Sequence, residues 1–104
     1  MKRMIQYTLK ADRVAENERY VEQVFDELRR LQPPGLHYAS LRLADGVSFM
    51  HLVSFDGADG DNPLPQLASF KAFVAGIRER CVVAPVTTEL REIGNYRLFD
   101  EAAR

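Results

Sequence analysis

The run GVSFMHLVSF at positions 46–55 limits the possible folds more than any other segment of the chain. It follows a turn signal, Ala44-Asp45-Gly46, and nearly every residue in it is apolar except two serines and His51. A strand that is apolar on both faces must be covered on both faces. We expect the chain's own helices on one face and a second copy of the molecule on the other. His51 is then a polar group in a buried place.

Composition predicts one domain over residues 1–104, a chain long enough for a single core. The net charge of −1 gives no basic surface for nucleic acid or for an anionic membrane. No apolar stretch approaches the ~20 residues of a membrane span. The basic N-terminus lacks the apolar core of a secretory signal, and Cys81 has no second cysteine to pair with. We therefore expect a cytoplasmic protein with no nucleic-acid or membrane partner.

Strand-like and helix-like patterns alternate along the chain. Ile5, Tyr7 and Leu9 recur at every second position, as in a strand with one face toward helices. Apolar residues spaced by three and four predict two amphipathic helices. The predicted order is strand 3–10, helix 14–31, strand 36–43, strand 46–55, helix 67–81 and strand 86–96. The tail at 97–104 is expected to be flexible or ordered only by a partner.

This order, β-α-β-β-α-β, predicts an α+β fold of the ferredoxin-like type: a four-stranded antiparallel sheet with two helices on one face. The other face is then bare, and we expect it to carry Met4, Thr8, Tyr38 and half of the apolar third strand. An exposed apolar patch of this size usually marks an interface. Two such sheets packed face to face across a two-fold axis would cover it, so we predict a homodimer.

Three segments carry a resemblance to a known family. They are the opening strand MIQYTLKAD, the hairpin GLHYASLRLADGVSFMHLVSF and the helix LASFKAFVAGI. Over roughly residues 4–96 the chain resembles the antibiotic-biosynthesis-monooxygenase-like family of the dimeric α+β barrel superfamily. That family includes cofactor-independent quinone-forming oxygenases, haem-degrading oxygenases and small dimers of unknown role.

The resemblance implies a dimeric α+β barrel and a monooxygenase-like activity on an aromatic or quinol-type small molecule, without metal, flavin or other cofactor. Haem-degrading members use an Asn-Trp-His set. This chain has no tryptophan, and Gln6 stands where the first-strand asparagine is expected, so the resemblance does not extend to haem degradation.

His51 is the candidate catalytic residue. A histidine with an ordinary pKa of ~6.5 can take a proton from a phenolic or enolic substrate and prepare it to react with oxygen. The alternative is a structural histidine, hydrogen-bonded inside a barrel or an interface. If His51 lines a cavity, catalysis is favoured; if it is sealed in packing with satisfied partners, a binding or structural role is favoured.

Gln6, Tyr38 and Arg42 are the candidate substrate-binding residues. Tyr38, Ser40 and Arg42 share one face of their strand, and Gln6 and Thr8 share one face of the first. If both sets point into the barrel, they offer hydrogen-bond donors to a substrate oxygen. The alternative is cross-strand hydrogen bonding with an exposed Arg42. The two histidines lack the spacing of metal ligands, so we expect no metal site.

Two other functions remain open at this stage. One is a non-catalytic dimer, which binds a small molecule in the same cavity or acts in a stress response. The other is an RNA-binding domain, since a common RNA-binding fold has the same strand order. The charge of the chain and the absence of an aromatic-rich RNA-binding motif argue against RNA.

Overall fold

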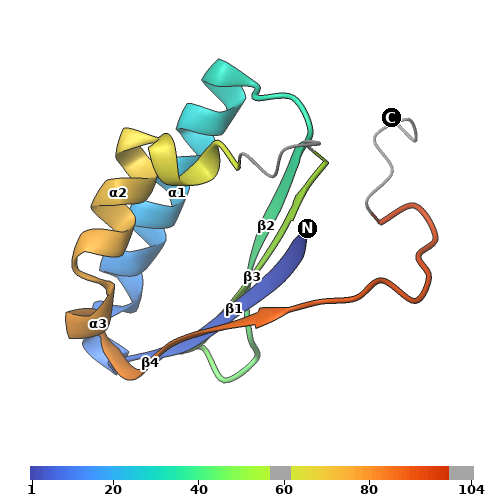
Figure 1. Ribbon diagram of the computed structural model, residues 1–104. Helices are drawn as coiled ribbons and strands as arrows, with labels where there is room; N and C mark the ends of the chain where they lie inside the picture. Colours follow the sequence, from blue (N-terminus) through green and yellow to red (C-terminus); the bar gives the residue numbers. More distant parts are fainter. Residues whose placement is uncertain (57–61, 99–104) are drawn as a thin grey trace.

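One antiparallel sheet carries all the helices on one of its faces (Figure 1). The computed structural model describes residues 1–56 and 62–98. Its elements are β1 (Lys2–Leu9), η1 (Ala11–Arg13), α1 (Val14–Leu31), β2 (Leu36–Arg42), β3 (Ser48–Phe55), η2 (Leu64–Gln66), α2 (Ala68–Ala75), α3 (Ile77–Arg80) and β4 (Cys81–Glu89). The predicted α+β fold class, with four antiparallel strands and helices on one side, is confirmed.

The strand order is β2-β3-β1-β4, so the apolar strand β3 lies inside the sheet and β2 and β4 form its edges. β3 pairs with β1 and β2, and the register places His51 opposite Ile5 on one side and Ser40 on the other. Tyr7 lies opposite Phe49, and both are buried beneath the helices. Because side chains alternate along a strand, His51 also lies on the helix-covered face.

The core lies between this face and the helices. Tyr7, Leu9, Phe49 and Val53 come from the sheet, as the alternation in the sequence predicts for β1. Val24 of α1 and Phe73 of α2 close it from the other side, with Leu64, Leu67 and Ile77, while Cys81 joins it from the start of β4. Figure 1 shows α1 and α2 lying side by side across the sheet.

A tight turn directs the chain from β2 into β3. The Asp45 carboxylate accepts hydrogen bonds from the backbone N–H groups of Val47 (3.0 Å) and Ser48 (2.8 Å) and from the Ser48 hydroxyl (2.6 Å). Gly46 has a φ of +79°, a left-handed conformation that residues with a Cβ rarely adopt. The predicted hairpin is therefore present. Asp45 accepts the hydrogen bonds of its turn, and Gly46 adopts the left-handed backbone conformation.

The second half of the chain departs from prediction in two places. The helix predicted over 67–81 is interrupted at Gly76, so that α2 and the short α3 are separate. The last strand begins at Cys81 rather than at 86, and it runs through Pro85. Proline is tolerated there because β4 is an edge strand, whose outer N–H groups have no ladder partner.

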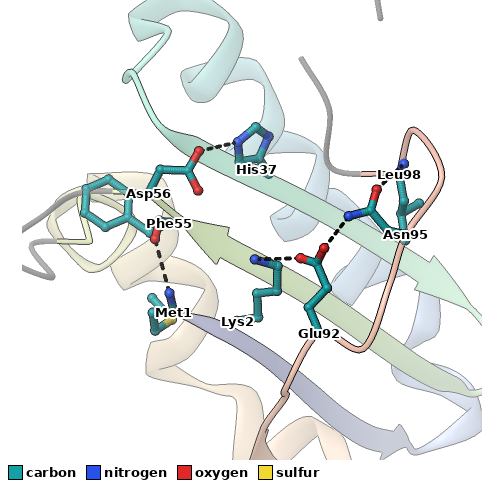
Figure 2. A network of polar contacts seen from close by, with 8 residues as sticks. All are labelled: Met1, Lys2, His37, Phe55, Asp56, Glu92, Asn95 and Leu98. Carbon is teal, nitrogen blue, oxygen red and sulfur yellow. Dashed lines mark hydrogen bonds and ion pairs between the residues drawn. The ribbon is translucent and has the colours of Figure 1, made fainter. Parts of the chain in front are cut away.

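Beyond β4, residues 90–98 form an extended arm without helix or strand, so the prediction of a strand to residue 96 is wrong. Figure 1 shows this arm running away from the helices. Figure 2 shows its attachment: the Lys2 ammonium lies 3.1 Å from the Glu92 carboxylate, which also accepts a hydrogen bond from Asn95. Ile93, at 91% exposure, and Tyr96, at 83%, contact little else. Of the tail predicted over 97–104, residues 99–104 lie outside the described residues.

The turn at Gly46 gives a test that separates backbone strain from crowding. Gly46→Ala should destabilise the protein by about 1–2 kcal/mol, because φ is left-handed although an added Cβ would meet no atom within 4 Å. Gly94→Ala is the matched control, since its added Cβ also meets nothing and its φ is not in that region. Urea unfolding of both variants measures the difference, and equal stabilities would contradict the explanation.

Candidate functional site

A cavity of about 210 Å³ lies between the sheet and helices α2 and α3. Its wall is largely apolar, built from side chains that include Ile5, Phe70, Phe73 and Ile77. Four polar side chains also line it: Tyr7 from β1, Tyr38 from β2, His51 from β3 and Thr87 from β4. We call Tyr7, Tyr38 and His51 the tyrosine–histidine cluster. An apolar cavity with a few converging polar groups is the usual form of a small-molecule site.

His51 is held by hydrogen bonds at both ring nitrogens. Its Nε2 lies 2.7 Å from the Tyr7 hydroxyl, and its Nδ1 lies 2.7 Å from the Tyr38 hydroxyl. The Ser40 hydroxyl lies 3.4 Å from Nε2 on the same face. The side chain is 2% exposed, so the ring lies at the cavity wall and is fixed by its two partners. Both conditions set out above hold together: His51 lines a cavity, and it is fully partnered.

Burial sets the protonation states of the cluster. It lowers the pKa of His51 from 6.5 to about 4, because a buried imidazolium loses its hydration. It raises the pKa of Tyr7 and of Tyr38 above the ordinary value for tyrosine, for the same reason. The three side chains are therefore uncharged at neutral pH.

Asn17 and Arg80 support the cluster from behind. The Asn17 amide donates from Nδ2 to the Tyr7 hydroxyl at 2.9 Å. Arg80 donates from Nε to Asn17 Oδ1 at 3.1 Å and from Nη2 to the Phe73 carbonyl at 2.7 Å. Asn17 is 0% exposed and Arg80 is 1% exposed, and the guanidinium lies 4.5 Å from the Tyr20 ring centroid.

The structure brings together two of the four predicted site residues, His51 and Tyr38. Tyr38 was expected on the bare face of the sheet, but the register of β2 with β3 places it opposite Val53, on the helix face. Gln6 pairs with Met50 on the opposite face and does not line the cavity. Arg42 lies beside a groove between α1 and β2, where it forms an ion pair with Glu18 at 3.2 Å.

Sequence reasoning missed Asn17 and Arg80, although both lie on helical stripes. Asn17 lies three residues after Val14 and four before Val21, at an apolar position of α1. Arg80 follows Ile77 by three residues, a spacing that places two side chains on the same side of a helix. A polar residue at a core position must find buried partners, and that signal was available in the sequence.

Comparison with known proteins gave no matching family model and no match among curated proteins. Solved structures of similar shape do exist. Two are bacterial proteins provisionally named antibiotic biosynthesis monooxygenases: one from Bacteroides thetaiotaomicron (14% identity, TM-score 0.75, 89% of each chain covered) and one from Caulobacter crescentus (18%, 0.72, 89% of each). A third is SnoaB, a cofactor-independent oxygenase from Streptomyces nogalater (16%, 0.61, 88% of this chain and 92% of that one).

These likenesses show a shared fold, the ferredoxin-like α+β arrangement of the antibiotic-biosynthesis-monooxygenase structures. The resemblance read from the sequence is confirmed at that level. At such low identities no residue role passes from those proteins to this chain. Among residues 1–56 and 62–98, no helix combines the length and the apolar composition needed to cross a membrane.

The depressed pKa of His51 predicts a specific loss of stability in acid. Between pH 6.5 and about 4 the unfolded chain binds a proton that the folded protein excludes, so the free energy of unfolding falls as pH falls. This contribution is on the order of 3 kcal/mol across the window. Urea unfolding at several pH values should show it, and His51→Asn should remove it.

His37→Gln is the matched control, because His37 lies on the opposite face of the sheet, paired with Ser54. The part of the pH dependence that His51 causes should persist in that variant. A His51→Asn protein with the full dependence of the parent would contradict the assignment.

Proposed function

We propose that the protein is a cofactor-independent, monooxygenase-like enzyme that oxidises a small aromatic or quinol-type molecule in the cavity beside the tyrosine–histidine cluster. The observation that carries the proposal is the composition of this cavity: apolar and aromatic walls, with hydroxyl and imidazole groups gathered on one side. Such walls suit a ring system, and the polar side suits a ring oxygen.

The volume of the cavity limits the size of the substrate. An apolar protein cavity of about 150 Å³ can hold benzene, whereas drug-sized ligands occupy roughly 300–1,000 Å³. At about 210 Å³ the cavity of this protein suits a molecule of one or two fused rings.

The reaction needs an electron-rich ring and O₂ only. A phenolic substrate places its oxygen against Tyr38, whose hydroxyl is held by His51 at 2.7 Å. The phenol gives its proton to water as it binds, and Tyr38 donates a hydrogen bond to the phenolate oxygen. The ring passes electrons to O₂, and a C–O bond forms at a ring carbon that carries hydrogen. The peroxide anion takes a proton from water to become the hydroperoxide, which loses water to give the quinone. One oxygen atom ends in the quinone carbonyl and the other in water. The apolar wall excludes bulk water from the reactive intermediate.

His51, expected from the sequence to act as the base, has a lowered pKa and two occupied nitrogens. In the proposed mechanism His51 therefore acts through Tyr38, while Tyr38 itself contacts the substrate. The likeness to SnoaB, a cofactor-independent oxygenase, supports this class of chemistry.

The second candidate function is a non-catalytic dimer that binds the same kind of molecule. The observation in its favour is that both His51 nitrogens already have partners, as in a structural histidine. Binding without oxygen consumption would support this candidate over the enzyme.

Oxygen uptake distinguishes the two functions. A panel of one- to three-ring phenols, hydroquinones and anthrones is incubated with the protein in an oxygen-electrode cell. We expect uptake with one- and two-ring compounds, and a loss of at least about tenfold in Tyr38→Phe and in His51→Ala. Tyr96→Phe is the matched control, since Tyr96 is 83% exposed on the arm. Binding without uptake in the parent protein would exclude the enzyme.

We further propose that the protein is a homodimer that buries the face of the sheet opposite the helices. The register places Met4, Met50, Leu52 and Val86 on that face, together with Gln6. Val86 is 59% exposed in the single chain, and Leu41, on the same face of β2, is 45% exposed. Exposed apolar side chains gathered on one face of a sheet are typical of an interface.

A single lysine on this face should separate the two copies. Val86→Lys should shift the mass measured by sedimentation from dimer to monomer, because the ammonium would be buried without a partner. Leu31→Lys is the control, since Leu31 is similarly exposed, at 50%, but lies at the end of α1. A parent protein that sediments as a monomer would exclude the dimer.

A further inference from the structure

The hydrogen bonds behind the cavity have a direction that one residue determines. An arginine can only donate hydrogen bonds, so the atom of Asn17 that faces Arg80 Nε must be the amide oxygen. The amide nitrogen of Asn17 then faces Tyr7 and donates to its hydroxyl oxygen at 2.9 Å. The orientation of Asn17, which an amide alone leaves ambiguous, is thus fixed by Arg80.

The same reasoning extends through the histidine. Tyr7 accepts from Asn17, so its own hydroxyl hydrogen is available for His51 Nε2 at 2.7 Å. A neutral imidazole that accepts at Nε2 carries its hydrogen on Nδ1. Nδ1–H then donates to the Tyr38 hydroxyl oxygen, 2.7 Å away. The hydrogen of Tyr38 is left to donate to an acceptor in the cavity that Tyr38 lines.

The opposite tautomer fits the same distances less well. If Nε2 carried the hydrogen, Tyr7 would accept from both His51 and Asn17, and its buried hydroxyl hydrogen would need a further acceptor. The described residues offer Tyr7 no hydrogen-bond partner other than these two. The Nδ1–H form gives Asn17, Tyr7 and both His51 nitrogens partners of the right kind, and leaves over only the Tyr38 hydroxyl hydrogen.

We propose that Arg80 and Asn17 are positioning residues that fix His51 as its Nδ1–H tautomer and so make Tyr38 a hydrogen-bond donor to a ligand oxygen. The series Arg80, Asn17, Tyr7, His51 and Tyr38 is called the donor chain below. The donor chain favours ligands that present a hydrogen-bond-accepting oxygen to Tyr38. It therefore binds phenolates or enolates more tightly than neutral phenols. This inference rests on the cavity assigned in the proposed function, and it specifies the charge state of the molecule bound there.

The charge of Arg80 favours the same class of ligand. Among the described residues no carboxylate lies within ion-pair distance of Arg80, whose contacts are Asn17, the Phe73 carbonyl and the faces of Tyr20 and Phe73. Glu16 is close enough for Arg80 to help lower its pKa, but its ion pair is with Arg13. A buried cation with no contacting counter-ion is stabilised further by an anion placed nearby in a medium of low dielectric constant. Hydrogen bonds aligned from a cation also strengthen one another.

The tautomer of His51 gives a direct test that needs no ligand. Long-range ¹H–¹⁵N spectra of the labelled protein at neutral pH distinguish Nδ1–H from Nε2–H, and His37→Gln assigns the two histidines of the chain. We expect His51 to be neutral and protonated on Nδ1. In Asn17→Leu, where the chain is cut, we expect both tautomers. A parent protein with His51 protonated on Nε2 would overturn the inference.

Ligand charge is tested with 4-nitrophenol, whose phenolate absorbs visible light. Titration of the bound and free probe should show the phenolate bound at least about tenfold more tightly than the phenol, a pKa shift of about one unit. Tyr38→Phe and Arg80→Met should reduce this preference toward none. Arg78→Met, a charge removed from the exposed side of α3, should retain it.

If Arg80→Met does not fold by circular dichroism, Tyr38→Phe and the tautomer spectrum decide the question. Equal binding of phenol and phenolate by the parent protein would overturn the inference. If the protein prefers phenolate and His51 is the Nδ1–H tautomer, but no oxygen is taken up, the proposed enzymatic function is excluded and the inference about the donor chain is retained.

Discussion

The hydrogen bond from Arg80 to Asn17 joins the last helical turn before β4 to the first long helix, and the order of the candidate site depends on it. Without this contact the Asn17 amide could face either way, and Tyr7 and His51 would lose a defined donor direction. The bond also places a guanidinium in the core, where its cost is offset by the Phe73 carbonyl and the Tyr20 ring. The Arg80 and Asn17 side chains therefore contribute both to the packing of the core and to the order of the hydrogen bonds in the candidate site.

Much of the architecture was predictable because it follows from periodicity. Alternation in β1, the helical stripe of α1 and the Asp45-Gly46 turn each specify local structure, and together they give the order of the fold. The apolar run around His51 predicted an inner strand, and β3 is one. The pairing of His51 with Tyr38 could not be read in the same way, because the face of each strand is set by register, and register depends on contacts between segments distant in sequence.

Asn17 and Arg80 escaped prediction for a different reason. Neither was among the predicted site residues, although its spacing from apolar neighbours on the helix pointed inward. Periodicity describes where a side chain points, but it does not say which inward polar residues will meet across 63 positions of sequence. The helix is also interrupted at Gly76, just before the short helix that carries Arg80, and that break was not predicted.

Gly76, where the second helix is interrupted, also lies close to the Arg80 side chain. A Cβ at this position would stand 3.2 Å from the Arg80 guanidinium, closer than ordinary contact allows. Even one methyl group there would press on the cation, whose neighbours in the core leave it little room to move. The absence of a side chain at Gly76 therefore leaves room for the guanidinium that holds Asn17, although Gly76 does not line the cavity.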